Sequence, residues 1–232
     1  MMKKRALSVF LMFILAAVAQ FGYSQDREMT IEELYLQNAE IRIIREQAVS
    51  QDRDMKLLAL DNIQGMLDEG KLSSGAPEAF FVLDYLSGEG INNQVTENKR
   101  LVNYYPEVRR RAVNLLGQLG GENAQTTLVT VLDNDIEPMV MAEAAYALGQ
   151  LGKNDNNVAS QAIARAILLE DVTLPDNNFA FASLLAFEKL AAANGGLNDS
   201  TAFQAIIRIA QGNYITKVRL KAVQVLDSLR RY

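Results

Sequence analysis

Cysteine, histidine and tryptophan are absent from this chain of 232 residues. Without cysteine the fold has no disulfide, and the lipid attachment that some exported bacterial proteins carry on a cysteine is excluded. Without histidine, Ser-His-Asp and Cys-His nucleophilic sites, histidine-ligated metal centres and the commonest general base are excluded as well. Packing alone must hold the fold together, and we assign no catalytic, metal-binding or cofactor-binding residue.

Positive charge is also scarce. The chain has 23 Lys and Arg residues against 28 Asp and Glu residues, a net charge of −5. A phosphate backbone requires a basic stripe. The run Arg109–Arg111 does not provide one, because consecutive residues of a helix point in different directions. We expect no nucleic-acid partner.

Residues 1–24 have the three-part layout of a secretory signal peptide. A basic start, Lys3 to Arg5, precedes a 14-residue apolar stretch at 6–19, and small residues offer cleavage after Ala19 or after Ser24. The stretch is shorter than the roughly 20 residues that span a bilayer, which favours cleavage over a retained anchor. The mature chain would then carry 20 basic and 28 acidic residues and no stable membrane span.

Two stretches, 32 residues apart, are near copies of one another. Pro106–Gly120 and Pro138–Gly152 both begin with proline and end in Leu-Gly-Gln-Leu-Gly. Self-similarity at a period of about 20–50 residues is typical of a solenoid, in which each unit buries its face against its neighbours. Gly117 and Gly149 lie inside these helices, where glycine costs about 1 kcal/mol relative to alanine. We therefore expect a compensation at both, either close helix contacts or helix termination just beyond, at Gly120 and Gly152.

The rest of the chain also predicts helices. Apolar residues recur at spacings of three and four, no segment alternates as a half-buried strand does, and all four prolines stand at predicted helix starts. The sequence predicts an all-α fold, an α-solenoid of about five hairpins over 25–232, with a polar insertion at 87–105 that is either functional or disordered. The predicted helices are 29–50, 52–68, 77–86, 106–119, 122–133, 138–151, 157–170, 176–193, 199–211 and 214–229.

The second helices of the five hairpins align without gaps on one apolar residue, here called the anchor. The anchors are Met55, Val108, Val140, Phe179 and Val218.

Residues 106–120 resemble the second helix of a HEAT repeat of the phycobilin-lyase-like type, and the segment from Val218 to Ala222 resembles another. The resemblance implies an α-α superhelix whose second helices line the concave side, and a protein-binding scaffold rather than a defined activity. It also implies that the arginine after the anchor, Arg109 or Arg219, bonds to an acid of an inter-helix turn. Met141 and Ala180 occupy that position in the middle repeats and interrupt the series.

One acidic segment partly resembles a calcium site. Residues 133–137 begin like an EF-hand loop, but Pro138 and Ala144 stand where that loop needs glycine and glutamate. We interpret the acids as belonging to a turn that caps the next helix. An enzyme, or an enzyme accessory, that uses carboxylates alone is kept as the least favoured alternative.

Positions between the core residues of the second helices are expected to face a partner. Arg111 and Tyr146 are the strongest candidates, because Arg and Tyr are enriched at binding hot spots. Tyr104 and Tyr105 of the insertion are a second candidate, with packing on the edge of the solenoid as the favoured interpretation. The predicted partner-binding residues are Arg111, Asn114, Gln118, Glu143, Tyr146, Gln150, Lys189, Lys221 and Gln224.

These patterns predict a non-enzymatic, exported scaffold, periplasmic or alternatively secreted, that binds a protein partner on its concave face. The runner-up is a structural subunit of an envelope assembly whose apolar ends pair with neighbouring chains.

Overall fold

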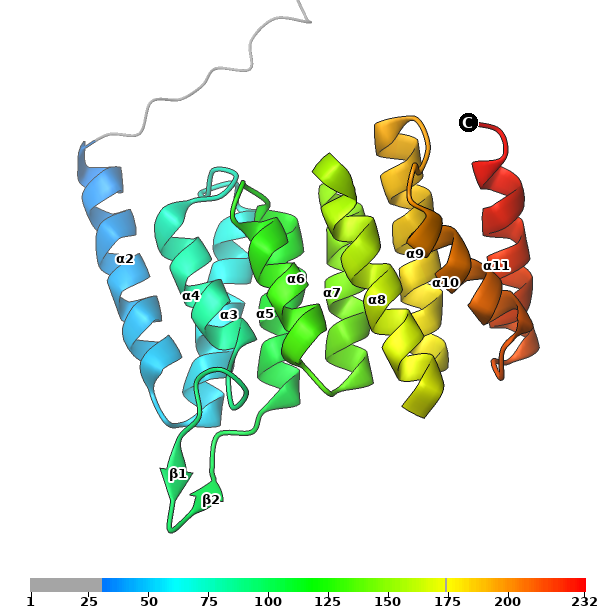
Figure 1. The fold of residues 1–232 in the computed structure, drawn as a ribbon. Coiled ribbons are helices and arrows are strands. Elements are labelled where there is room, and N and C mark those ends of the chain that lie inside the picture. The colour runs from blue at the N-terminus through cyan, green and yellow to red at the C-terminus, as the bar shows by residue number, and fades with distance from the viewer. Residues whose placement is uncertain (1–30, 174) are drawn as a thin grey trace, which may run out of the picture. The chain divides into compact units, whose positions relative to one another are not determined.

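The computed structural model describes residues 31–173 and 175–232, so the predicted signal peptide lies outside the described residues (Figure 1). The chain divides into two units, Met1–Ala39 and Glu40–Tyr232. The described part of the first is helical, and the second holds the remaining elements.

The described residues form ten α-helices and one short hairpin of strands, which confirms the predicted all-α solenoid. The helices are α2 (Ile31–Val49), α3 (Arg53–Asp68), α4 (Pro77–Ser87), α5 (Pro106–Leu119), α6 (Ala124–Asn134), α7 (Pro138–Leu151), α8 (Val158–Thr173), α9 (Asn177–Asn194), α10 (Ser200–Gln211) and α11 (Thr216–Leu229). The strands are β1 (Thr96–Glu97) and β2 (Arg100–Leu101), and a 3-10 turn, η1 (Asp155–Asn157), precedes α8.

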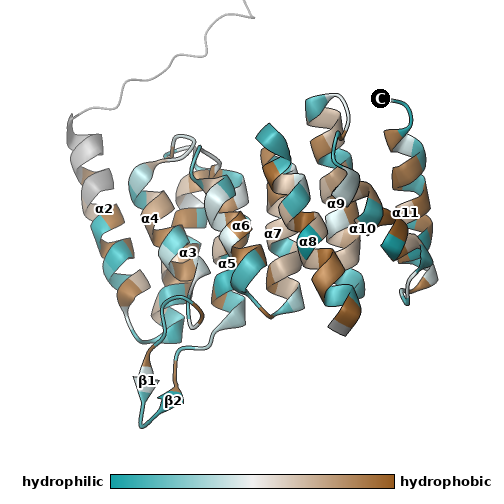
Figure 2. Ribbon diagram, in the orientation of Figure 1, coloured by the Kyte–Doolittle hydropathy of each residue, from teal (hydrophilic) through white to brown (hydrophobic). Residues whose placement is uncertain are grey.

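Within Glu40–Tyr232 the helices stand side by side in two layers (Figure 1). One layer holds the second helices of the hairpins, in which α3, α5, α7, α9 and α11 each pack against the next. The other holds the first helices, with α4, α6, α8 and α10 in contact in that order. Hydrophobic segments occur on each helix of both layers (Figure 2), as expected where every unit is buried by its neighbours.

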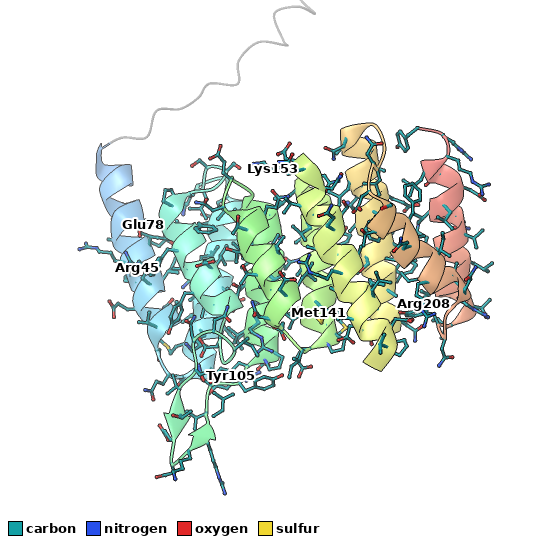
Figure 3. The ribbon with its side chains drawn as sticks, in the orientation of Figure 1. Arg45, Glu78, Tyr105, Met141, Lys153 and Arg208 are labelled. Carbon is teal, nitrogen blue, oxygen red and sulfur yellow. The ribbon has the colours of Figure 1, made fainter. Side chains whose placement is uncertain are left out.

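Salt bridges also join neighbouring first helices. Arg45 of α2 lies beside Glu78 of α4 (Figure 3), with 3.0 Å between Nη1 and Oε2. The same guanidinium lies 4.6 Å from the ring centroid of Phe81.

Prolines fix the starts of three helices. Pro77, Pro106 and Pro138 are first residues of α4, α5 and α7, where the missing N–H costs nothing. Pro175 does not begin a helix, because α9 begins at Asn177 after an Asp176 cap, one residue later than predicted. The Asp176 side chain accepts the N–H groups of Asn178 and Phe179, which is the stronger start signal.

The aligned anchors occupy equivalent buried positions in four of the five second helices: Val108, Val140, Phe179 and Val218. Met55 is the exception, since 38% of its surface is exposed. The residue after it, Lys56, is buried instead. The alignment was therefore right in register, and Ala59, Ile63 and Met66 of α3 are buried as aligned, but it was wrong about Met55.

Two glycines allow close helix contacts, one of the two compensations that the sequence predicts. A Cβ on Gly117 would lie 2.8 Å from Cβ of Ala147, and one on Gly149 would lie 2.6 Å from Cα of Ala186. These positions bring α5 against α7 and α7 against α9, so glycine at these sites offsets its low helix propensity with tighter packing.

The insertion contains strands, which the sequence did not predict. Asn98 and Lys99 both have positive φ, the conformation of a type I′ turn that suits a two-residue hairpin loop. The turn pairs Thr96 with Leu101 and Glu97 with Arg100. The strands are two residues long, which is too short for an alternating pattern to appear in the sequence.

Candidate functional site

The nine predicted partner-binding residues lie on one side of α5, α7, α9 and α11, here called the wall. They stand three, six or ten residues after the anchor of their helix. None of the nine is buried; Gln118, Gln150, Lys189 and Gln224 are exposed, and the other five are half-buried.

Polar contacts connect the wall from helix to helix at its N-terminal end. Arg111 of α5 forms a salt bridge with Asp61 of α3. Asn114 Nδ2 donates to Glu143 Oε1 of α7 at 2.7 Å. Gln64 of α3 donates to Gln118 at 3.2 Å. These side chains satisfy one another, so this part of the wall is an ordered polar surface rather than a set of free groups.

The C-terminal end of the wall is richer in cations. Lys189 Nζ of α9 lies 5.0 Å from the ring centroid of Tyr146 on α7, a cation–π contact. Lys221 Nζ of α11 lies 2.5 Å from Glu188 Oε2 of α9. The structure thus places both Arg111 and Tyr146 in contacts with neighbouring second helices.

A pocket of about 320 Å³ opens in the wall between α9 and α11. It exists because Ala182, three residues after the anchor of α9, stands where α5, α7 and α11 carry Arg111, Glu143 and Lys221. The main-chain N–H of Ile215 donates to Asn177 Oδ1 at 2.9 Å and fixes the edge of the pocket. Its lining is Asn177, Asn178, Phe181, Ala182, Leu185, Ile215, Lys217 and Val218.

Sequence reasoning did not identify Phe181, Ile215 or Lys217 as site residues. The alignment of the second helices did contain one signal, because apolar Ala182 and Leu185 interrupt the polar pattern of the wall. That interruption does not show whether a pocket forms there.

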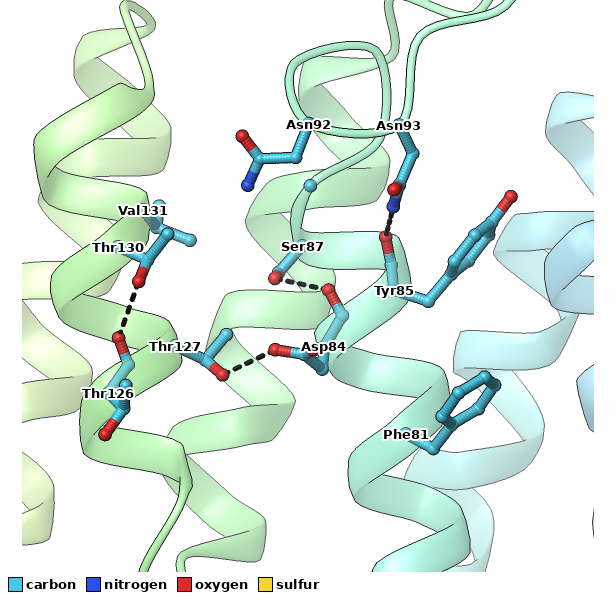
Figure 4. A pocket seen from close by; sticks show the side chains of 11 residues that line it. Phe81, Asp84, Tyr85, Ser87, Asn92, Asn93, Thr126, Thr127, Thr130 and Val131 are labelled. Atoms are coloured by element: carbon cyan, nitrogen blue, oxygen red, sulfur yellow. Dashed lines mark hydrogen bonds between the residues drawn. The ribbon is translucent and has the colours of Figure 1, made fainter.

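A second cavity, of about 350 Å³, lies between α4, α6 and the start of the insertion (Figure 4). Its polar groups largely bond to one another. Thr127 donates to Asp84 at 2.5 Å, and Asn93 Nδ2 donates to the Tyr85 carbonyl at 2.7 Å. These bonds join α6 and the insertion to α4, so we interpret the cavity as a packing seam.

Buried charges tie the second helices to the turns of the following hairpins. Arg109 is fully buried and donates through Nε and Nη2 to the two oxygens of Asp135 in the turn after α6, at 2.6 and 3.0 Å. Burial lowers the pKa of Arg109, but the hydrogen bonds and charge of Asp135 outweigh burial and hold that pKa above its ordinary value. The predicted bond from Arg109 to an acid of an inter-helix turn is present.

The same expectation for Arg219 was wrong. Arg219 is exposed, and no ion pair of its side chain occurs in the described residues. Arg109 binds an acid that belongs to the next hairpin along the chain. Arg219 lies on α11, which is the last helix in the described residues. The equivalent buried cation is Lys56, whose Nζ lies 3.0 Å from Glu89 Oε2.

The insertion closes over these charges. Asn103 is buried; its Nδ2 donates to Glu89 Oε1 at 2.8 Å, and its Oδ1 accepts the N–H of Val95 at 2.8 Å. Tyr104 donates to Glu137 Oε1 at 2.7 Å, and its ring centroid lies 4.7 Å from the Arg109 guanidinium. Tyr105 is half-buried against the core. Both tyrosines are thus packed on the solenoid.

The acids of the EF-hand-like segment are occupied by protein groups. Asp135 holds Arg109 and accepts the N–H of Glu137, while Asp133 binds Arg165 of α8. Across residues 31–173 and 175–232, no group of three potential ligands is placed to hold a metal ion. Over the same residues, none of the helices has the length and apolar content needed to cross a membrane.

Residues 99–174, which run from the insertion through α5, α6, α7 and α8, match the family model for HEAT repeats. No curated protein matches the chain. The match agrees with the observed hairpins and supports the predicted HEAT-repeat architecture, which commonly serves as a scaffold for protein interactions.

Proposed function

We propose that this chain is a non-enzymatic, exported scaffold that binds a protein partner on the wall formed by its second helices. One observation carries the proposal: side chains of the wall are ordered by contacts between successive helices and still accessible, with the α9–α11 pocket among them. An ordered surface loses little conformational entropy on binding, which favours affinity.

Three finer parts of the proposal come from the sequence. The signal-peptide pattern at 1–24 supports export, to the periplasm or alternatively to the medium. The resemblance of residues 106–120 supports the phycobilin-lyase-like type of HEAT repeat and a concave position for the wall. The absence of histidine and cysteine from the sequence supports a binding role rather than catalysis.

Crosslinking in cells, followed by mass spectrometry, tests the proposal. A photoreactive residue placed at Gln150 or Gln224, both exposed on the wall, should capture a defined protein. The double variant Arg111→Glu/Tyr146→Ala should lose that capture while keeping the wild-type melting temperature. Arg110→Glu is the matched control, because Arg110 is exposed and precedes the wall position by one residue. Unchanged capture by the double variant would contradict the proposal.

A second candidate, a structural subunit, is favoured by one observation on α11. Val223 stands five residues after its anchor, and the equivalent Val113, Ala145 and Leu184 are fully buried by neighbouring repeats. Val223 is 47% exposed, and Leu220 beside it is exposed as well. Assembly through α11 predicts concentration-dependent sedimentation of the wild type that Leu220→Glu/Val223→Glu abolishes; a concentration-independent monomer would exclude it.

A further inference from the structure

The geometry points to a specific occupant of the α9–α11 pocket: an acidic segment of a protein partner that inserts one apolar side chain. This inference rests on the proposed function and adds to it the anchoring point and the chemistry of the partner.

The lining of the pocket is largely apolar. Phe181 and Ile215 are large hydrophobic side chains that remain exposed at the pocket, at 40% and 55%. Leu185 and Val218 complete an apolar floor. The pocket volume of about 320 Å³ is at the lower end of the range for ligand pockets, which suits one side chain of a peptide rather than a large cofactor.

Charged side chains stand at the rim of the pocket. Lys217 lines the pocket, and no ion pair of Lys217 occurs among the described residues. Lys221 lies one turn further along α11, and Lys189 lies one turn beyond Leu185 on α9. The acids near them are Glu188, which is paired with Lys221, and Asp176, which caps α9. Glu170, which interacts with Asp176, and Asp171, which pairs with Arg208, lie beyond the edge of the pocket at Asn177 and Tyr214. Among the residues that line the pocket Lys217 is the charged one, so the mouth of the pocket is positive on a chain of net charge −5 and selects a negatively charged segment.

The remainder of the wall differs from this pocket in its contacts. From α3 to α7, Arg111, Asn114 and Gln118 bond to neighbouring polar side chains, so this part of the wall offers a partner polar surface contacts rather than an apolar anchor. Binding energy concentrates where an apolar anchor enters a pocket ringed by polar groups. The pocket between α9 and α11 has that arrangement.

Panning a phage-displayed random-peptide library against the full chain tests the occupant, followed by anisotropy with the fluorescein-labelled consensus peptide. We expect peptides with one Leu, Ile or Phe flanked by Asp or Glu. Ala182→Arg, which places the Arg111-type side chain in the pocket, should weaken binding at least about tenfold. Lys217→Glu should weaken it several-fold and reduce the dependence of Kd on salt.

Ala192→Arg is the matched control, because Ala192 is exposed on the last turns of the same helix. Enrichment of basic or uncharged peptides, or equal binding by Ala182→Arg and wild type, would overturn the inference. So would a self-association that Ala182→Arg abolishes, since the occupant would then be a second copy of the chain. If crosslinking from the wall captures a partner that Ala182→Arg retains, the scaffold function stands and only the pocket assignment fails.

Discussion

Lys56 of α3 and Arg109 of α5 occupy the same position after the anchors of their helices, and each places its cationic group on an acid of the next hairpin. Lys56 contacts Glu89 at the start of the insertion, and Arg109 contacts Asp135 in the turn between α6 and α7. All four side chains are at most 2% exposed. The two pairs are joined, because Arg109 Nη1 also donates to the Glu89 carbonyl at 3.0 Å.

Removing one member of a buried ion pair leaves the other charge buried without a partner. Arg109→Met should therefore lower the free energy of unfolding by about 3–5 kcal/mol, since Asp135 keeps its burial and loses its partner. Urea denaturation at pH 7 measures the change. Arg219→Met is the matched control at the equivalent position of α11, and its exposed side chain predicts a change within about 0.5 kcal/mol. Equal effects of the two variants would refute the structural role of the buried pair.

Replacing glycine by alanine should have opposite effects at two helical positions. Gly149→Ala puts a Cβ 2.6 Å from the Ala186 backbone, so we expect a loss of about 1–3 kcal/mol despite the better helix propensity. Gly65→Ala in α3 meets no atom within 4 Å and should gain about 0.5–1 kcal/mol. Thermal denaturation of both variants gives the comparison. A stabilised Gly149→Ala would mean that α7 and α9 are less closely packed than the structure has them.

The buried amide of Asn103 should control the order of the insertion. Asn103→Ala removes the acceptor for the Val95 N–H and a donor to Glu89, which should cost about 1–3 kcal/mol and lower the hydrogen-exchange protection of residues 88–103. Asn92→Ala is the control, because Asn92 is exposed and none of the side-chain hydrogen bonds in the described residues involves it. Unchanged protection in Asn103→Ala would show that the hairpin turn alone orders the segment.

The repeat pattern was sufficient to predict the fold. It did not predict which side chains far apart in the sequence form pairs. Each hairpin repeats the same periodic pattern, so helices, pairing order and register follow from one alignment. Lys56 and Glu89 are 33 residues apart on either side of α4, and only the packed structure shows that they meet. The alignment did contain a signal: Lys56 follows Met55 as Arg109 follows Val108.

The candidate site was likewise predictable from the sequence only in part. The wall positions follow from counting along aligned helices, and the structure places all nine predicted residues on accessible helix surface. Whether a pocket forms between two helices cannot be predicted by counting residues along the sequence. The α9–α11 pocket depends on a small side chain at Ala182 and on the loop that brings Ile215 next to Asn177, 38 residues away.

Alkaline pH should destabilise the fold through Tyr214. Tyr214 is buried, and burial first, then the charge of the nearby Asp171 carboxylate, raises the pKa of Tyr214 well above its ordinary value. The unfolded chain loses this proton near pH 10 while the folded chain retains it, so the unfolded state binds fewer protons. The contribution of Tyr214 to stability is therefore complete below about pH 10 and is lost as pH rises, by up to about 1.4 kcal/mol per pH unit.

Urea denaturation between pH 7 and pH 11 measures this dependence, and Tyr214→Phe should make the decline shallower than in the wild type. Tyr232→Phe is the control, because that ring is exposed. Arg208 binds the largely buried Asp171 carboxylate, so Tyr214→Phe leaves the acid with a cationic partner and should keep the fold intact. An unchanged slope would show that Tyr214 ionises as readily in the folded chain as in the unfolded one, which its burial beside a carboxylate argues against.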